Sequence, residues 1–170
     1  MRQLGIYSIY DYMVKADIKG YLLVPQCPEG YNRAGNRESK PYTDNVKHLI
    51  KQYVEKGNVD PIRVCIFGVS MGGSGIWKML GEMTDTFAAA LIASGQYPDI
   101  DLNKTAKTPV YLTIGGAEGN RISSFQNMAE GLKDNGGDVM FDILPDLNHG
   151  ETCVQSFTDE RMAWVFNHKR

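Results

Sequence analysis

Ser70 stands in the stretch of the chain whose residue types best suit covalent chemistry, a Gly-x-Ser-x-Gly pattern at residues 68–72. Residues 63–68 read as a buried strand, and residues 76–80 begin a helical stripe. A serine on a glycine-flanked turn from strand to helix is held out at the tip of the turn instead of being buried. This context predicts that Ser70 is a nucleophile and that the amide of Met71, in the first turn of the helix, faces a developing oxyanion.

The same five residues also have a plain structural reading. Gly-x-Ser-x-Gly occurs by chance in many chains, and Ser70 would then simply begin a helix after a buried strand. A serine hydroxyl is a weak nucleophile until a base takes its proton. The two readings are therefore separated by whether a histidine and an acid follow at the ends of later strands.

Glu118 and His149 follow two later apolar runs, where the predicted strands end. Glu118 comes four residues after the run at residues 109–114, and His149 lies just past the run at residues 139–144. Because the carboxyl ends of parallel strands meet at one edge of a sheet, we expect both side chains near Ser70. A neutral imidazole takes a serine proton near pH 7, and a carboxylate on the far ring nitrogen fixes its tautomer. The order serine, acid, histidine is the one that hydrolases with this serine turn use.

Other residues compete for these two roles. Glu118 has an alternative reading as a solvated loop acid, and Asp142, within a strand, and Asp146, in the loop after it, are weaker rivals. His48 lies in a predicted helix and His168 lies near the end of the chain, so neither follows a strand. His149 is therefore the expected base.

Composition places the chain among globular proteins and argues against several partners. Its 170 residues suit one domain, residues 1–170, and 42% hydrophobic with 22% charged residues argues against disorder. A formal net charge of −2 favours neither nucleic acid nor an acidic membrane surface as a partner. No apolar run approaches the roughly 20 residues of a membrane span, and the start of the chain has no signal-peptide pattern. The location stays open: cytoplasmic for the chain as given, secreted or periplasmic for a longer parent.

Three cysteines, Cys27, Cys65 and Cys153, are spaced neither as a disulfide framework nor as metal ligands. Cys65 lies inside the strand before the serine turn and reads as a small apolar residue. We expect no metal and no cofactor.

Short apolar runs alternate with amphipathic segments along the chain. The predicted strands are residues 21–24, 63–68, 87–93, 109–114 and 139–144. The predicted helices are residues 3–16, 42–56, 76–83, 122–132 and 154–168. This alternation predicts an α/β fold, a mostly parallel sheet of about five strands with helices on both faces.

Five stretches of the chain carry a recognisable pattern. They are Val-Pro-Gln-Cys-Pro at 24–28, Asp-Pro-Ile-Arg-Val at 60–64, Gly-Val-Ser-Met-Gly-Gly at 68–73, Phe-Ala-Ala-Ala at 87–90, and the stretch from Leu-Lys at 132–133 to Asn-His-Gly at 148–150. Together they resemble the α/β-hydrolase fold, and within it a family of esterases and predicted peptidases related to feruloyl and acetyl-xylan esterases. The resemblance covers most of the chain from about residue 20 onward.

This resemblance implies a carboxylic ester hydrolase that works through an acyl-enzyme. It implies Ser70 as the nucleophile, His149 as the base and Glu118 as the acid, acting on a small-molecule or carbohydrate-linked ester. The same residues permit a serine peptidase of the same fold. A third alternative, from another class, is a catalytically impaired module that binds a ligand or carbohydrate.

Two departures from the family pattern stand out. Glu118 occupies a position where aspartate is usual, and residues 1–20 contain nothing like the family's His-Gly-x-Gly loop, which supplies the second oxyanion amide. Loss of one such amide costs about 10²–10³ in rate. We therefore expect a fold that lacks its N-terminal strands, as in a fragment or a chain trimmed at its start. We expect residues 21–24 to pair directly with residues 63–67, or a second copy to complete the sheet as a homodimer.

Aromatic and amide side chains near strand ends are the candidates for substrate contact. They are Tyr31, Gln96 and Tyr97. Trp77 lies on the helix after Ser70 and is expected in the core.

Overall fold

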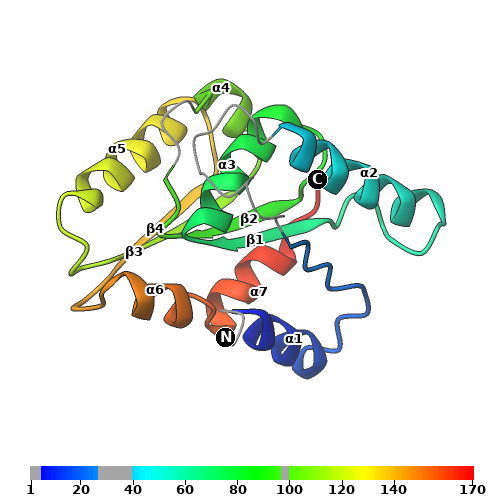
Figure 1. Cartoon of the computed structure of the whole chain (residues 1–170), viewed down its shortest axis with the longest axis horizontal. Helices are drawn as coiled ribbons and strands as arrows, with labels where there is room; N and C mark the ends of the chain where they lie inside the picture. The colour runs from blue at the N-terminus through cyan, green and yellow to red at the C-terminus, as the bar shows by residue number, and fades with distance from the viewer. Residues whose placement is uncertain (1–4, 27–39, 97–99) are drawn as a thin grey trace.

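A four-stranded parallel sheet forms the centre of the structure, with its strands in chain order (Figure 1). The computed structural model describes residues 5–26, 40–96 and 100–170. The strands are β1 (Cys65–Val69), β2 (Ala89–Ala93), β3 (Val110–Gly115) and β4 (Val139–Leu144). Since neighbours are parallel, the carboxyl ends of all four strands meet at one edge.

Helices cover both faces of this sheet (Figure 1). One face carries α2 (Lys40–Glu55), α3 (Met71–Glu82), α4 (Leu102–Thr105) and α5 (Arg121–Asp134). The other carries α1 (Ile6–Lys15), α6 (His149–Gln155) and α7 (Asp159–Asn167). Within the described part of the chain, no helix combines the length and the apolar character that a membrane crossing requires.

The two central strands are buried on both sides because both faces of the sheet are covered. Every residue of β2 and β3 is buried. Consecutive side chains point to opposite faces, so Ile92 packs with Trp77 of α3, while Leu91 packs with Val165 of α7. The indole of Trp77 also donates a hydrogen bond to the carbonyl of Gly95 at 2.8 Å. Trp77 is therefore a core residue, as expected.

The α/β architecture and its parallel sheet confirm the sequence prediction. Four predicted strands form β1 to β4, while the predicted helix at residues 154–168 is divided between α6 and α7. The division has a local cause: the hydroxyl of Thr158 accepts the backbone N–H of Arg161 at 3.4 Å and caps a new helix there. The short helix α4 was not expected.

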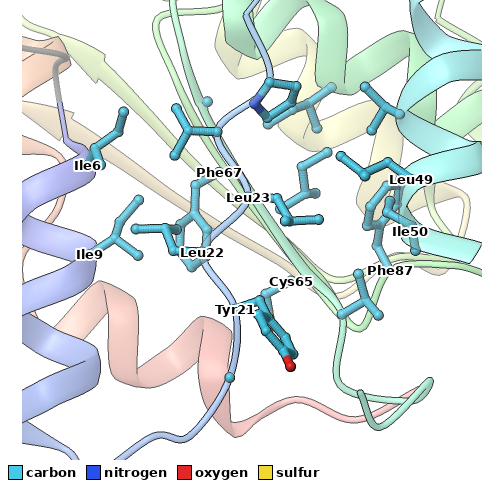
Figure 2. A pocket seen from close by; sticks show the side chains of 18 of the residues that line it. Ile6, Ile9, Tyr21, Leu22, Leu23, Leu49, Ile50, Cys65, Phe67 and Phe87 are labelled. Atoms are coloured by element: carbon cyan, nitrogen blue, oxygen red, sulfur yellow. The ribbon is translucent and has the colours of Figure 1, made fainter. Parts of the chain in front are cut away.

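The predicted strand at residues 21–24 is wrong, and so is its direct pairing with β1. Among the described residues β1 pairs with β2 alone, and a cavity of about 1090 Å³ is lined by both segments. Figure 2 shows Leu22 beside Ile9 and Phe67, and the ring of Tyr21 lies 4.8 Å from that of Tyr53. The segment therefore meets β1 and the helices through side chains such as Leu22 and Tyr21, without a backbone ladder to β1. Completion of the sheet by a second copy stays a prediction.

Candidate active site

Ser70 occupies the turn between β1 and α3 in a backbone conformation that few residues adopt. Its φ is 50°, in the left-handed region, with ψ at −118°. The surrounding backbone holds Ser70 there. The N–H of Ser70 donates to the carbonyl of Ala93 at 2.8 Å, and the carbonyl of Ser70 accepts the N–H of Ser74 at 3.0 Å. A strained residue held by its neighbours is typical of a functional turn.

Gly68 and Gly73, not Gly72, allow the strand and the helix to approach. A Cβ at Gly68 would lie 2.7 Å from a side-chain atom of Ile76 and 2.8 Å from the carbonyl carbon of Gly72. A Cβ at Gly73 would lie 3.0 Å from the backbone of Gly95, whereas one at Gly72 would meet nothing within 4 Å. Gly72 is therefore not needed for this close approach, because a side chain there would point into open space.

The structure brings Ser70, His149 and Glu118 together in one chain of contacts. Ser70 Oγ lies 2.9 Å from His149 Nε2, and His149 Nδ1 lies 2.8 Å from Glu118 Oε2. These distances are those of hydrogen bonds. The imidazole side chain is 44% exposed, whereas the side chain of Glu118 is 2% exposed. The histidine therefore lies between solvent and a buried carboxylate.

Glu118 receives hydrogen bonds on both of its oxygens. Oε1 accepts from the hydroxyl of Ser94 at 2.5 Å and from the backbone N–H of Gly115 at 3.0 Å. Burial alone would raise the pKa of Glu118, but the bonds from Ser94, Gly115 and His149, with the charge of Arg121, lower it below its usual value. The carboxylate is ionised at neutral pH.

The loops that carry Glu118 and His149 touch backbone to backbone. A Cβ at Gly115 would lie 2.1 Å from the carbonyl oxygen of Leu147, so only glycine fits at the end of β3. His149 is the first residue of α6, and Asn148 caps that helix by accepting the N–H of Glu151 at 3.1 Å. The close packing at Gly115 and the Asn148 cap together fix the backbone position of His149, from which its side chain extends.

Arg121, one turn after Glu118, is a further member of this group. Its Nη1 donates to Glu118 Oε2 and lies 2.7 Å from His149 Nδ1, and its Nη2 donates to the carbonyl of Ser94 at 2.5 Å. Its Nε donates to Gln96 Oε1 at 3.3 Å. Arg121 and Ser94 were not predicted from the sequence. Their signals were the position of Ser94 directly after an apolar run and the spacing of three residues between Glu118 and Arg121.

The rival residues lie elsewhere in the structure. Asp142 accepts from the hydroxyl of Tyr111 at 2.8 Å and from Arg161 at 2.9 Å. His48 contacts Gln52 of its own helix, and His168 contacts Trp164 and Asp138. Asp146 is exposed in the loop before His149, with φ at 58°. Of the acids considered from the sequence, Glu118 is the one with a hydrogen bond to His149 among the described contacts.

The roles of the remaining predicted site residues stay predictions. Met71 begins α3 next to Ser70, so its N–H has no carbonyl one turn earlier in the helix to bond. The side-chain oxygen of Gln96 accepts a hydrogen bond from Arg121. Tyr31 and Tyr97 lie outside the described residues. Within residues 5–26, 40–96 and 100–170, no group of three or more His, Cys, Asp or Glu side chains is placed to hold a metal ion.

The parallel sheet, the helices on both faces and the serine turn after β1 define an α/β-hydrolase fold. A family model described as the dienelactone hydrolase family matches residues 25–163. The chain belongs to this family and is a member of the α/β hydrolases. No curated protein matches the chain by sequence.

Several solved structures, two of them esterases by name, share the fold at low sequence identity. A thermostable esterase is 23% identical over 77% of this chain and 37% of its own, with a TM-score of 0.67. SOBER1 of Arabidopsis thaliana is 21% identical over 84% of this chain and 70% of its own, with a TM-score of 0.61. The Bacillus cereus carboxylesterase is 13% identical over 95% of this chain and 82% of its own, with a TM-score of 0.63. At these identities the likeness establishes the fold alone.

Proposed function

We propose that the chain is a serine carboxylic ester hydrolase that works through an acyl-enzyme. The single observation that carries the proposal is the unbroken contact chain from Ser70 Oγ through His149 to Glu118, at 2.9 and 2.8 Å. A serine becomes a usable nucleophile when a neutral imidazole accepts its proton and a carboxylate orients that imidazole. The dienelactone hydrolase family match and the esterase neighbours agree with this chemistry.

The proposed reaction needs one tautomer of His149, and the contacts of the ring with Ser70 and Glu118 suit that tautomer. With the ring proton on Nδ1, His149 donates to Glu118, and Nε2 is free to accept the proton of Ser70. The opposite tautomer would turn Nε2 into a donor toward Ser70 and would take one donor away from the buried carboxylate. Arg121 Nη1, which is a donor only, lies 2.7 Å from Nδ1, so in the first arrangement it bonds to Glu118 Oε2 and not to the ring.

Each step of the proposed reaction uses an atom that lies at the sheet edge. Ser70 Oγ bonds to the ester carbonyl carbon while its proton passes to His149 Nε2, and the oxyanion that forms faces the N–H of Met71. His149 returns the proton to the alcohol oxygen as the ester C–O bond breaks. A water molecule then gives its proton to His149 and attacks the acyl carbon, after which Ser70 regains a proton and the acid leaves.

The experiment that tests this proposal is hydrolysis of matched ester and amide substrates. We expect turnover of p-nitrophenyl acetate or of a feruloyl ester, loss of that turnover in Ser70→Ala, and much slower cleavage of a p-nitroanilide. Equal ester turnover in the wild type and Ser70→Ala would contradict the proposal. Amide cleavage at a rate comparable with that of the esters would favour a peptidase, and ligand binding without any turnover would favour a binding module.

A further inference from the structure

Arg121 makes three hydrogen bonds around the buried carboxylate, each from a different nitrogen, and its Nη1 also lies 2.7 Å from His149 Nδ1. Nη1 donates to Glu118 Oε2, Nη2 to the carbonyl of Ser94 at 2.5 Å, and Nε to Gln96 Oε1 at 3.3 Å. The planar guanidinium is the side chain that presents donors in such a fixed fork. The fork joins the end of β2 to the loop after β3.

We propose that Arg121 is a positioning residue, which holds the carboxylate of Glu118 so that Oε2 faces Nδ1 of His149. This proposal rests on the proposed function of the same site. It adds a fourth residue whose contribution to turnover passes through Glu118 instead of through contact with substrate.

The hydrogen-bond donors around Glu118 explain how Arg121 would hold the carboxylate in position. Oε1 accepts from Ser94 and Gly115, and Oε2 accepts from Arg121 and His149. A carboxylate offers about two acceptor positions on each oxygen, so all are occupied. Removal of Arg121 frees one position on the oxygen that faces the histidine, and the carboxylate gains freedom to rotate away from it.

The place of Arg121 in its helix argues against a role in helix stability. Arg121 is the first residue of α5, at the positive end of the helix dipole, where a cation is unfavourable. The side chain is 32% exposed and turns toward Glu118, whose own side chain is 2% exposed. A buried carboxylate requires a compensating charge, and Arg121 supplies it. The presence of an arginine at position 121 is therefore explained by its pairing with Glu118 and not by the stability of α5.

A double-mutant cycle with Glu118 tests this role directly. We expect Arg121→Gln to lower kcat about 10- to 100-fold, the scale of a small misplacement, with KM changed less than about twofold. We expect Arg121→Lys, which keeps the charge but not the fork, to recover part of that loss. In a Glu118→Gln background, Arg121→Gln should lower kcat less than about twofold further, because its partner is already changed.

Arg161→Gln provides the matched control. Arg161 also pairs with a carboxylate, Asp142, at 2.9 Å, and its side chain is 13% exposed. We expect this variant to lose stability and to keep kcat. An unchanged kcat in Arg121→Gln would overturn the proposal, and so would a loss that adds in full to that of Glu118→Gln.

A second readout does not depend on activity. Arg121 contributes to the lowered pKa of Glu118, so the carboxyl of Glu118 should titrate at higher pH in Arg121→Gln, as followed by ¹³C NMR. If the wild type hydrolyses no ester, the proposed function fails while this titration still tests the contact. An unchanged Glu118 titration in Arg121→Gln would overturn the positioning role by itself.

Discussion

The hydroxyl of Ser94 lies 2.5 Å from Oε1 of Glu118, while the other oxygen of the same carboxylate faces His149. Ser94 directly follows β2, and its φ of 52° turns the chain at the edge of the sheet where β3 also ends. The residue that follows β2 therefore takes part in holding the acid, although β2 leads into none of the three residues assigned to the reaction.

Ser94→Ala tests whether this hydroxyl stabilises the ionised carboxylate. We expect a loss of about 1–3 kcal/mol in the free energy of unfolding, because a buried carboxylate loses a donor. We also expect the pKa of Glu118 to rise, because the Ser94 hydrogen bond lowers it. Urea unfolding and NMR titration of Glu118 are the measurements. Ser123→Ala, which removes an exposed hydroxyl of α5, is the control, and equal effects in the two variants would refute the assignment.

Gly68→Ala tests the close approach of β1 and α3. The new Cβ would lie 2.8 Å from the backbone of Gly72, which cannot move without displacing the serine turn. We expect a destabilisation of about 1–3 kcal/mol, measured by urea unfolding. Gly72→Ala is the matched control, because nothing lies within 4 Å of its Cβ and alanine favours a helix by up to about 1 kcal/mol. Equal unfolding midpoints in the two variants would show that the packing argument is wrong.

Acidification should destabilise the fold partly through Glu118. The folded carboxyl has a lowered pKa, so the unfolded chain binds this proton first as the pH falls. The stabilisation is complete above the ordinary carboxyl range, about pH 4 to 5, and is lost as the pH falls through the lower pKa of the folded state. Urea midpoints at neutral and acidic pH measure the loss.

Glu118→Gln should show a smaller loss of stability on acidification than the wild type does. Glu130→Gln, at an exposed position of α5, is the control and should behave like the wild type. If Glu118→Gln and the wild type lost the same stability on acidification, the buried carboxylate would have no part in the pH dependence.

Local sequence patterns accounted for the elements that are buried on both sides. The runs that became β2 and β3 are apolar except for Thr113, and such runs are typical of a covered parallel sheet. Residues 21–24 are equally apolar but do not form a strand, since a strand depends on a partner that the local sequence does not specify. The break before α7 could have been found from Thr158, a typical helix cap ahead of two acidic residues.

The part of the candidate site that consists of single residues at strand ends could be predicted from the sequence. The carboxyl-end rule correctly grouped Ser70, His149 and Glu118. Ser94 and Arg121 were missed because their roles depend on contacts with Glu118 across two loops, which spacing alone does not reveal. Gln96 was expected to touch substrate; its side chain accepts a hydrogen bond from Arg121, and its contact with substrate stays a prediction.

Labelling with a fluorophosphonate, which forms a covalent bond with an activated serine, tests the central claim most directly. We expect one adduct on the folded wild-type chain, located at Ser70 by peptide mass spectrometry, absent in Ser70→Ala and formed far more slowly in His149→Gln. The exposed hydroxyl of Ser123 should stay unlabelled and serves as the internal control. An adduct at another serine, or no adduct on the folded chain, would contradict the assignment of Ser70 as an activated nucleophile.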